Sequence, residues 1–209
     1  SLPMVKSKSS RRWLDERLKD KYVKDIADSG YRSRASYKLL EMQEKDGFMR
    51  PGMTIVDLGA APGGWSQIAM SFVGPKGKIF ATDILPMEPI TGVDFIQGDF
   101  SKDEVFDDLV SRIADSPVDL VISDMAPNIS GISAIDQPRC ISLAELALEF
   151  ARSILKPGAY FLVKVFQGEG TEAFKEQVSH HFHKVKIRKP DASRARSKEF
   201  YFLAEGFNQ

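Results

Sequence analysis

The distribution of apolar and polar residues predicts a regular alternation of strands and helices from residue 53 onward. Short apolar runs rich in β-branched residues alternate with longer segments in which apolar residues recur every three or four positions. We expect strands at 53–58, 78–84, 93–97, 118–123, 159–166, 184–188 and 199–204, and helices at 65–73, 103–114, 138–155 and 172–182. This alternation is typical of an α/β fold with a parallel sheet and helices on both faces.

The last two predicted strands break the alternation. Only residues 189–198 separate them, which is too short a connection for a helical crossover between parallel strands. We therefore expect these two strands to pair antiparallel. The prediction is a seven-stranded, mostly parallel sheet with an antiparallel last strand.

The first fifty residues are organised differently. Residues 1–11 are polar and basic, and we expect a flexible tail there. Apolar residues recur with a helical period over 13–27 and again over 36–45. The chain is thus expected to form a single domain over 12–209, with a basic helical extension at about 12–50.

Composition indicates an ordinary soluble protein. Hydrophobic residues make up 43% of the 209 residues, and 29 Lys and Arg balance 29 Asp and Glu. No apolar run is long enough to span a membrane, and the N-terminal residues do not form the apolar stretch of a secretory signal. The single cysteine, Cys140, excludes an intramolecular disulfide. We expect a cytoplasmic protein that acts as a monomer.

The balanced charge hides two basic segments. Residues 1–40 hold eleven Lys and Arg against five acidic residues, and residues 183–198 hold seven against one. Each segment therefore carries +6, and the remainder of the chain carries −12. Two basic segments on an acidic body indicate a polyanionic partner such as RNA. The candidates for contacts with RNA phosphates are Arg32, Arg34, Lys189, Arg194 and Arg196.

A glycine-rich turn follows the first strand of the predicted sheet. The segment 57–66 reads DLGAAPGGWS, and in open α/β sheets a ligand binds beyond the carboxyl end of a strand at such a turn. Asp83 ends the second strand and Asp99 follows the third, where carboxylates are suited to ribose hydroxyls and an adenine amino group. The dinucleotide pattern G-x-G-x-x-G and the P-loop pattern are both absent. The turn and the reversed last strand together resemble the Rossmann-like fold of S-adenosylmethionine-dependent methyltransferases.

Four segments narrow this resemblance. They are DLGAAPGGWS at 57–66, SDMAPN at 123–128, VKVFQGEG at 163–170 and RKPDASRAR at 188–196. Together they closely resemble the FtsJ/RrmJ family, the ribosomal RNA large-subunit methyltransferases E, which methylate the ribose 2′-oxygen of a uridine in 23S ribosomal RNA. The resemblance runs from about residue 12 to residue 204. It implies S-adenosylmethionine as cofactor, and ribosomal RNA or the large ribosomal subunit as partner.

The resemblance also implies site residues. The positions that match the family's cofactor site are Gly63, Trp65, Asp83, Asp99 and Asp124. The positions that match its catalytic tetrad are Lys38, Asp124, Lys164 and Glu199, with Lys164 as the central residue.

The chemistry of methyl transfer leaves two roles open for Lys164. A ribose hydroxyl is a poor nucleophile, and a lysine at its ordinary pKa of about 10.4 is charged and accepts no proton. A desolvated Lys164 would act as the base, whereas a charged Lys164 would stabilise the developing alkoxide. We favour the charged role, because Asp124 and Glu199 both oppose neutralisation.

Other functions compete with this prediction. A nicotinamide oxidoreductase is disfavoured by the absent G-x-G-x-x-G pattern, and a non-enzymatic RNA-binding protein by the complete tetrad. A ribose 2′-O-methyltransferase acting on transfer RNA or another RNA remains an alternative. We expect no metal site, because no acidic residue follows His180, His181 and His183 at ligand spacing.

Overall fold

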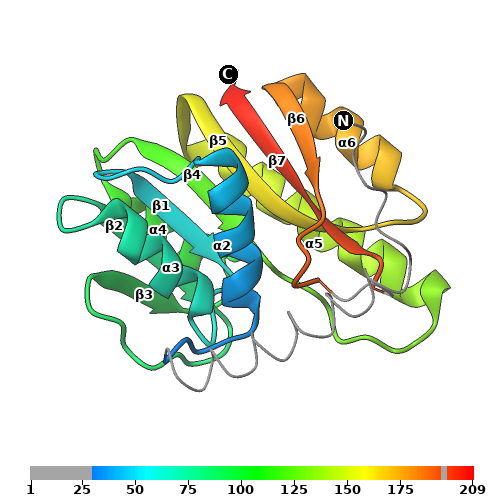
Figure 1. Cartoon of the computed structure of the whole chain (residues 1–209), viewed down its shortest axis with the longest axis horizontal. Coiled ribbons are helices and arrows are strands. Elements are labelled where there is room, and N and C mark those ends of the chain that lie inside the picture. The colour runs from blue at the N-terminus through cyan, green and yellow to red at the C-terminus, as the bar shows by residue number, and fades with distance from the viewer. Residues whose placement is uncertain (1–29, 194–196) are drawn as a thin grey trace, which may run out of the picture.

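The computed structural model describes residues 30–193 and 197–209, and its core is one seven-stranded sheet (Figure 1). The strands are β1 (Thr54–Leu58), β2 (Lys78–Asp83), β3 (Val93–Gln97), β4 (Val118–Ser123), β5 (Leu155–Phe166), β6 (Phe182–Arg188) and β7 (Glu199–Phe207). Their order across the sheet is β3-β2-β1-β4-β5-β7-β6, and β7 is antiparallel to both of its neighbours. The predicted fold class and the reversed last strand are confirmed.

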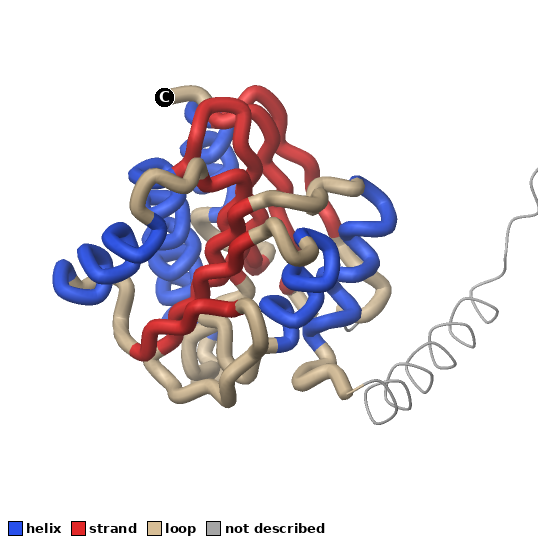
Figure 2. The backbone as a smooth tube through the Cα atoms, turned by 90° about the vertical axis from the view of Figure 1, so that its left-hand side faces the viewer, coloured by secondary structure: helices blue, strands red, loops and turns tan. Residues whose placement is uncertain are grey.

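Helices cover both faces of the sheet, as Figure 2 shows from the side. The helices are α2 (Ala35–Asp46), α3 (Gly64–Val73), α4 (Asp103–Ile113), α5 (Ser133–Ile154) and α6 (Thr171–His181). Side chains of α2 and α3 pack in one apolar cluster on one face. Those of α4, α5 and α6 pack in a second cluster on the other face. The sheet is therefore a central layer that is buried on both sides.

The burial of the last two strands explains their order in the sheet. β7 is buried on both faces, with Tyr201 and Leu203 on one and Phe202 and Ala204 on the other. A strand that is apolar on both faces is stabilised by an interior position. β6 is largely exposed and carries basic residues, which are typical of an edge strand. β7 therefore lies between β5 and β6.

Helix α5 differs most from the sequence prediction. It begins at Ser133, five residues before the predicted start, so that Pro138 lies inside the helix. The helix ends at Ile154, and β5 begins directly at Leu155 rather than at residue 159. The expected helix at 13–27 and the expected tail at 1–11 lie outside the described residues.

Candidate active site

The glycine-rich turn after β1 lines a small crevice at the carboxyl end of the sheet. Its walls include Asp57, Gly59, Trp65 and Asp124, and its volume is about 90 Å³. Gly59 has a φ of +71°, and a Cβ there would lie 2.3 Å from the Cγ of Met125. Only glycine allows this backbone conformation and this close approach without strain. The turn is thus shaped by the glycine at residue 59.

The start of helix α2 forms one wall of the crevice. Gly64 opens α3, and a Cβ at this position would lie 2.4 Å from the Oγ of Ser36. Ser33 and Ala35, just before and at the start of α2, also line the crevice. The absence of a side chain at Gly64 therefore lets the start of α2 pack against the turn.

Asp57 is buried beneath this turn and is only 1% exposed. Its carboxylate accepts a hydrogen bond from the Oγ of Ser66 at 2.7 Å. The pKa of Asp57 is raised to about 7, mainly by burial and further by the negative charges of Asp124 and Asp83. The Ser66 hydrogen bond lowers this pKa but does not offset burial. Three carboxylates thus surround the turn and favour a cationic ligand.

Asp83 shapes the same crevice from the end of β2. Its two carboxylate oxygens accept hydrogen bonds from the backbone N–H groups of Ala61 and Leu85, each at 2.9 Å. The next two side chains, Ile84 and Leu85, are apolar and exposed. An acceptor beside exposed apolar side chains is suited to a ligand with hydroxyl groups and an aromatic ring.

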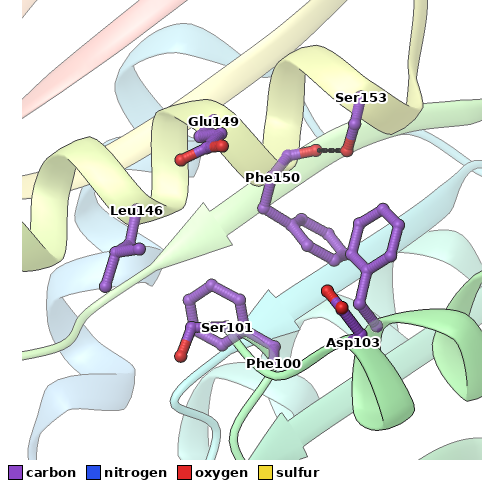
Figure 3. A pocket seen from close by; sticks show the side chains of 8 residues that line it. Phe100, Ser101, Asp103, Leu146, Glu149, Phe150 and Ser153 are labelled. Carbon is purple, nitrogen blue, oxygen red and sulfur yellow. Dashed lines mark hydrogen bonds between the residues drawn. The ribbon is translucent and has the colours of Figure 1, made fainter.

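Asp99 is held by the segment that follows β3. Its Oδ1 accepts hydrogen bonds from the N–H and the Oγ of Ser101, and these bonds lower the pKa of Asp99. The next residue, Phe100, packs edge-to-face on Phe150 of α5 with ring centroids 5.6 Å apart. Figure 3 shows these two residues lining a separate pocket of about 240 Å³ between α4 and α5. This packing anchors the backbone that carries Asp99.

The structure brings the four tetrad residues together. The Nζ of Lys164 lies 3.1 Å from Asp124 and 3.5 Å from Glu199, and the Nζ of Lys38 lies 2.5 Å from Glu199. The Lys164 side chain is 9% exposed, and the other three side chains are also mostly buried. Four residues that are distant in sequence thus form one alternating array of charges.

The electrostatics of the array favour a charged Lys164. Burial lowers the pKa of Lys164, but the carboxylates of Asp124 and Glu199 more than offset this, so that the pKa is raised above its ordinary value. Burial raises the pKa of Glu199, but Lys38 and Lys164 more than offset it, so that this pKa is lowered. Both groups are therefore ionised at neutral pH.

Sequence reasoning missed Tyr201. Its hydroxyl donates a 2.6 Å hydrogen bond to the Oδ1 of Asp124, the oxygen that also faces Lys164. Burial and the Asp124 charge raise the pKa of Tyr201 well above its ordinary value, so it remains a donor. The alternation of side chains along a strand could have identified Tyr201, because it places this residue on the same face as Glu199.

Trp65 lines the crevice and also packs in the core. Its indole is buried, its Nε1 donates a 2.7 Å hydrogen bond to the carbonyl of Ala35, and its ring lies 5.7 Å from that of Tyr201. The side chain therefore packs between α2 and Tyr201 of the sheet.

The candidate RNA-binding residues have different environments. Arg32 donates hydrogen bonds to the carbonyls of Pro62, Glu88 and Pro89, and so ties the glycine-rich turn to the segment after β2. Lys189 donates to the carbonyls of Ser197 and Glu199. Arg34 is half-buried at the start of α2. Two further candidates, Arg194 and Arg196, lie outside the described residues.

Over 30–193 and 197–209, no three His, Cys, Asp or Glu side chains are grouped so that they could hold a metal ion. No helix within the same ranges has the length and apolar character needed to cross a membrane.

The chain is similar to known proteins over nearly its whole length. The family model described as FtsJ-like methyltransferase matches residues 31–207. The chain is 57% identical over 204 residues to a ribosomal RNA large subunit methyltransferase E from Cellvibrio japonicus, covering 98% of this chain and 97% of the relative. It is 58% identical to the protein of the same name from Pseudomonas aeruginosa, covering 98% and 99%.

A solved structure has the same fold. A crystal structure from Plasmodium falciparum, titled as a ribosomal RNA methyltransferase, matches with a TM-score of 0.75 and 31% identity. The match covers 85% of this chain and 98% of that chain. The family model, the close relatives and this structure agree, and the chain belongs to the FtsJ-like methyltransferase family.

Proposed function

We propose that the protein transfers a methyl group from S-adenosylmethionine to the ribose 2′-oxygen of a uridine in 23S ribosomal RNA, with the assembled large ribosomal subunit as substrate. The observation that carries this proposal is the position of Asp124. This residue lines the crevice of the glycine-rich turn and also pairs with Lys164 in the tetrad. One carboxylate thus joins a candidate cofactor site to a candidate catalytic site. The names of the close relatives support ribosomal RNA as the substrate.

The crevice is chemically suited to S-adenosylmethionine. Among residues 30–193 and 197–209, its lining includes the carboxylates of Asp57 and Asp124 and no lysine or arginine. A cofactor with a sulfonium and an ammonium group is stabilised by such surroundings, whereas the pyrophosphate of a dinucleotide is not. We infer that Asp83 accepts from the ribose hydroxyls, that Asp99 accepts from the adenine amino group, and that the exposed Ile84 packs on the adenine ring. Gly63 and the backbone of Trp65 complete the proposed site.

The tetrad supplies the remaining chemistry. When bound, S-adenosylmethionine supplies an electrophilic methyl carbon, so the protein mainly has to position the ribose hydroxyl. We infer that the ammonium of Lys164 stabilises the ribose oxygen while that oxygen bonds to the methyl carbon and its proton passes to a solvent water. The bond that breaks is the one between the methyl carbon and the sulfonium sulfur. Asp124 and Glu199 orient Lys164, and Tyr201 orients Asp124. Lys38 holds Glu199.

RNA is expected to reach the tetrad across the two basic segments. Arg34, Lys189, Arg194 and Arg196 are proposed to contact phosphates. Arg32 donates to three backbone carbonyls, so its contribution to RNA binding includes holding the turn in place. We further infer that the protein acts as a monomer in the cytoplasm, where large ribosomal subunits are available.

The proposed function is tested by incubation with radiolabelled S-adenosylmethionine. Parallel reactions contain transfer RNA, naked ribosomal RNA, or large ribosomal subunits that lack the methyl group. We expect label in the 23S RNA of the subunits, on a single uridine ribose. Label in transfer RNA instead would redirect the proposal to another RNA. Absence of label in all pools, with RNA still bound, would favour a non-enzymatic role.

Cofactor binding is tested at Asp83. We expect Asp83→Ala to weaken S-adenosylmethionine binding by about 1–3 kcal/mol, because hydroxyl groups of the ligand lose their acceptor. Titration calorimetry measures the affinity, and circular dichroism checks the fold. A matched control is Asp94→Ala, at an exposed carboxylate of β3. Equal affinities for wild type and Asp83→Ala would remove Asp83 from the site.

A further inference from the structure

A second concavity opens beside the tetrad, and we call it the apolar pocket. Its walls include Ile129, Gln137, Cys140, Phe166 and Lys198, and its volume is about 300 Å³. This volume is at the lower end of the range for small-molecule sites, as suits a single ring. None of the residues named above for the cofactor crevice or the tetrad is among its walls.

The walls come from the segments that carry the tetrad. Ile129 is in the segment after Asp124, and Phe166 is two residues after Lys164 on β5. Lys198 directly precedes Glu199, whose backbone pairs with that of Phe166. The apolar pocket is therefore adjacent to the tetrad along three separate segments of chain.

Electrostatics agree with this placement. Burial raises the pKa of the Cys140 thiol, Asp136 raises it further, and the positive charge of Lys164 opposes the rise. Cys140, one wall of the apolar pocket, therefore lies within electrostatic range of the Lys164 ammonium.

Hydrogen bonds form the pocket in advance of any ligand. The carboxylate of Asp136 accepts from the N–H and Oγ of Ser130 and from the N–H of Gly131, which fixes the segment after Asp124. The Nε2 of Gln137 donates to the carbonyl of Phe166 at 2.9 Å, which ties α5 to the end of β5. A pocket held in this way loses little conformational entropy on binding.

Exposed isoleucines lie at the pocket and in the chain segment beside it. Ile129 is 61% exposed, and Ile132 and Ile135 nearby are also exposed. Grouped exposed apolar side chains mark a binding surface. Lys198 stands among them and makes no ion pair with any residue of 30–193 or 197–209. The walls also include Asp136, whose carboxylate is already bonded to Ser130 and Gly131, so the Lys198 ammonium is the charge available to a ligand. Apolar surface beside a cation is complementary to a nucleotide, whose base is flat and whose phosphate is negative.

We propose that the apolar pocket receives the nucleobase of the nucleotide that is methylated, with Lys198 placed against its phosphate. The inference rests on the proposed function. The base is attached to the ribose carbon next to the one that carries the 2′-hydroxyl. A hydroxyl held at Lys164 therefore brings its own base into the immediate neighbourhood of the tetrad. Burial of the base between Ile129 and Phe166 fixes the ribose and presents one hydroxyl to the methyl carbon.

The competing location is a third pocket on the other side of Glu199. It is lined by Ile187, Phe200 and Lys189 among others. It has about 340 Å³ and shares Lys198 with the apolar pocket. Glu199 also lines this third pocket, but none of its walls comes from the segment after Asp124, the tetrad residue that lines the crevice. The apolar pocket, whose wall includes Ile129 of that segment, is therefore the better site for the base.

The test compares two exposed isoleucines of similar accessibility. Ile129→Ser alters the apolar pocket and Ile187→Ser, at a residue that is 53% exposed, alters the third pocket. Val110→Ser on α4 controls for the loss of an exposed apolar side chain elsewhere. Steady-state methylation of unmethylated large subunits gives KM and kcat for each variant, and calorimetry gives the affinity for S-adenosylmethionine.

We expect Ile129→Ser to raise KM for the subunits about tenfold, with cofactor affinity unchanged and kcat changed far less. Ile129→Leu should restore KM, because it restores the apolar wall. A KM for Ile129→Ser equal to that of Val110→Ser would overturn the inference. So would a tenfold rise confined to Ile187→Ser, or a fall in kcat without a change in KM. If wild type transfers no methyl group to any RNA, the proposed function fails and the inference fails with it.

Discussion

Lys164 shows how burial and charge together set the role of a single residue. Its side chain is buried at the apolar end of β5, where an unpaired cation would be strongly destabilising. The carboxylates of Asp124 and Glu199 offset that cost and raise its pKa. The structure therefore favours a lysine that stays charged through the neutral range over one that acts as a base.

The first prediction concerns this residue. Lys164→Ala should reduce single-turnover methylation by about 10²–10³, since one well-placed electrostatic contact is lost, while cofactor and RNA still bind. Lys156→Ala, on the same strand near its opposite end, is the matched control. A rate for Lys164→Ala near that of wild type would contradict the mechanism.

A pH–rate profile separates the two roles of Lys164. Because its pKa is raised above the ordinary value, its charge is constant from pH 6 to 9 and contributes no titration there. Lys38→Ala and Glu199→Ala should therefore leave the position of any ascending limb unchanged. A limb that moves in either variant would identify Lys164 as the base.

A second prediction at the residue scale concerns Asp57. Its pKa is raised from 3.8 to about 7, so the folded state favours the protonated carboxyl. The stability that this group contributes is fully present below pH 3.8 and is lost as the pH rises through about 7. Asp57→Asn should therefore be least different from wild type in acid and increasingly more stable toward pH 8. Urea unfolding at several pH values measures the difference, and a constant difference would contradict the raised pKa.

At the scale of elements, an ion pair fixes helix α2 against the sheet. Arg188 on β6 donates two hydrogen bonds of 2.8 Å to the carboxylate of Asp46 at the end of α2. Lys186 also lies 3.5 Å from Asp46. Since α2 carries Lys38, this tie contributes to the position of the tetrad.

The third prediction removes this tie. Asp46→Asn should lower the free energy of unfolding by about 1–3 kcal/mol, because the Arg188 guanidinium loses its charged partner. The Arg188 hydrogen bonds lower the pKa of Asp46, so its contribution is present above pH 3.8 and is lost on acidification through the lower folded value. Asp107→Asn, at an exposed position of α4, is the control. Equal unfolding midpoints for the two variants would show that the ion pair contributes nothing.

Elements were predicted well where the apolar period was strong. The strands at 93–97 and 118–123 were predicted with the observed bounds, because their apolar runs are bounded by polar residues and turns. The predicted helix begins at Pro138, and proline is favoured in the first turn of a helix. In the structure Asp136 fixes the preceding segment through Ser130, and the helix begins earlier, at Ser133. A side-chain contact outweighed the preference of proline there.

At the scale of the whole molecule, charge is divided between two basic segments and an acidic body. This predicts RNA binding that weakens steeply with salt, because bound phosphates release counterions. Parts of both segments, at 1–29 and 194–196, lie outside the described residues.

The fourth prediction tests this charge distribution. Arg194→Glu should weaken RNA binding and reduce the slope of log affinity against log salt, while cofactor affinity is unchanged. Lys76→Glu is the control, because Lys76 is exposed in the connection before β2, at the opposite end of the strands. Equal slopes for the two variants would place the RNA elsewhere.

The resemblance to the FtsJ/RrmJ family, and not a local pattern, predicted Lys38, Asp124, Lys164 and Glu199 as the tetrad. The fold class and the glycine-rich turn were predictable from the sequence alone. These features depend on local patterns: apolar periods, glycines with positive φ, and motifs that are continuous in the chain. That β7 lies beside β5 was visible in the three-dimensional structure and not in the sequence. This strand order brings Glu199 and Tyr201 next to Lys164 and Asp124. The tertiary structure also decided that Trp65 supports Tyr201 from the core. The physical reason is that strand order and side-chain contacts depend on burial between segments far apart in sequence, which no local pattern encodes.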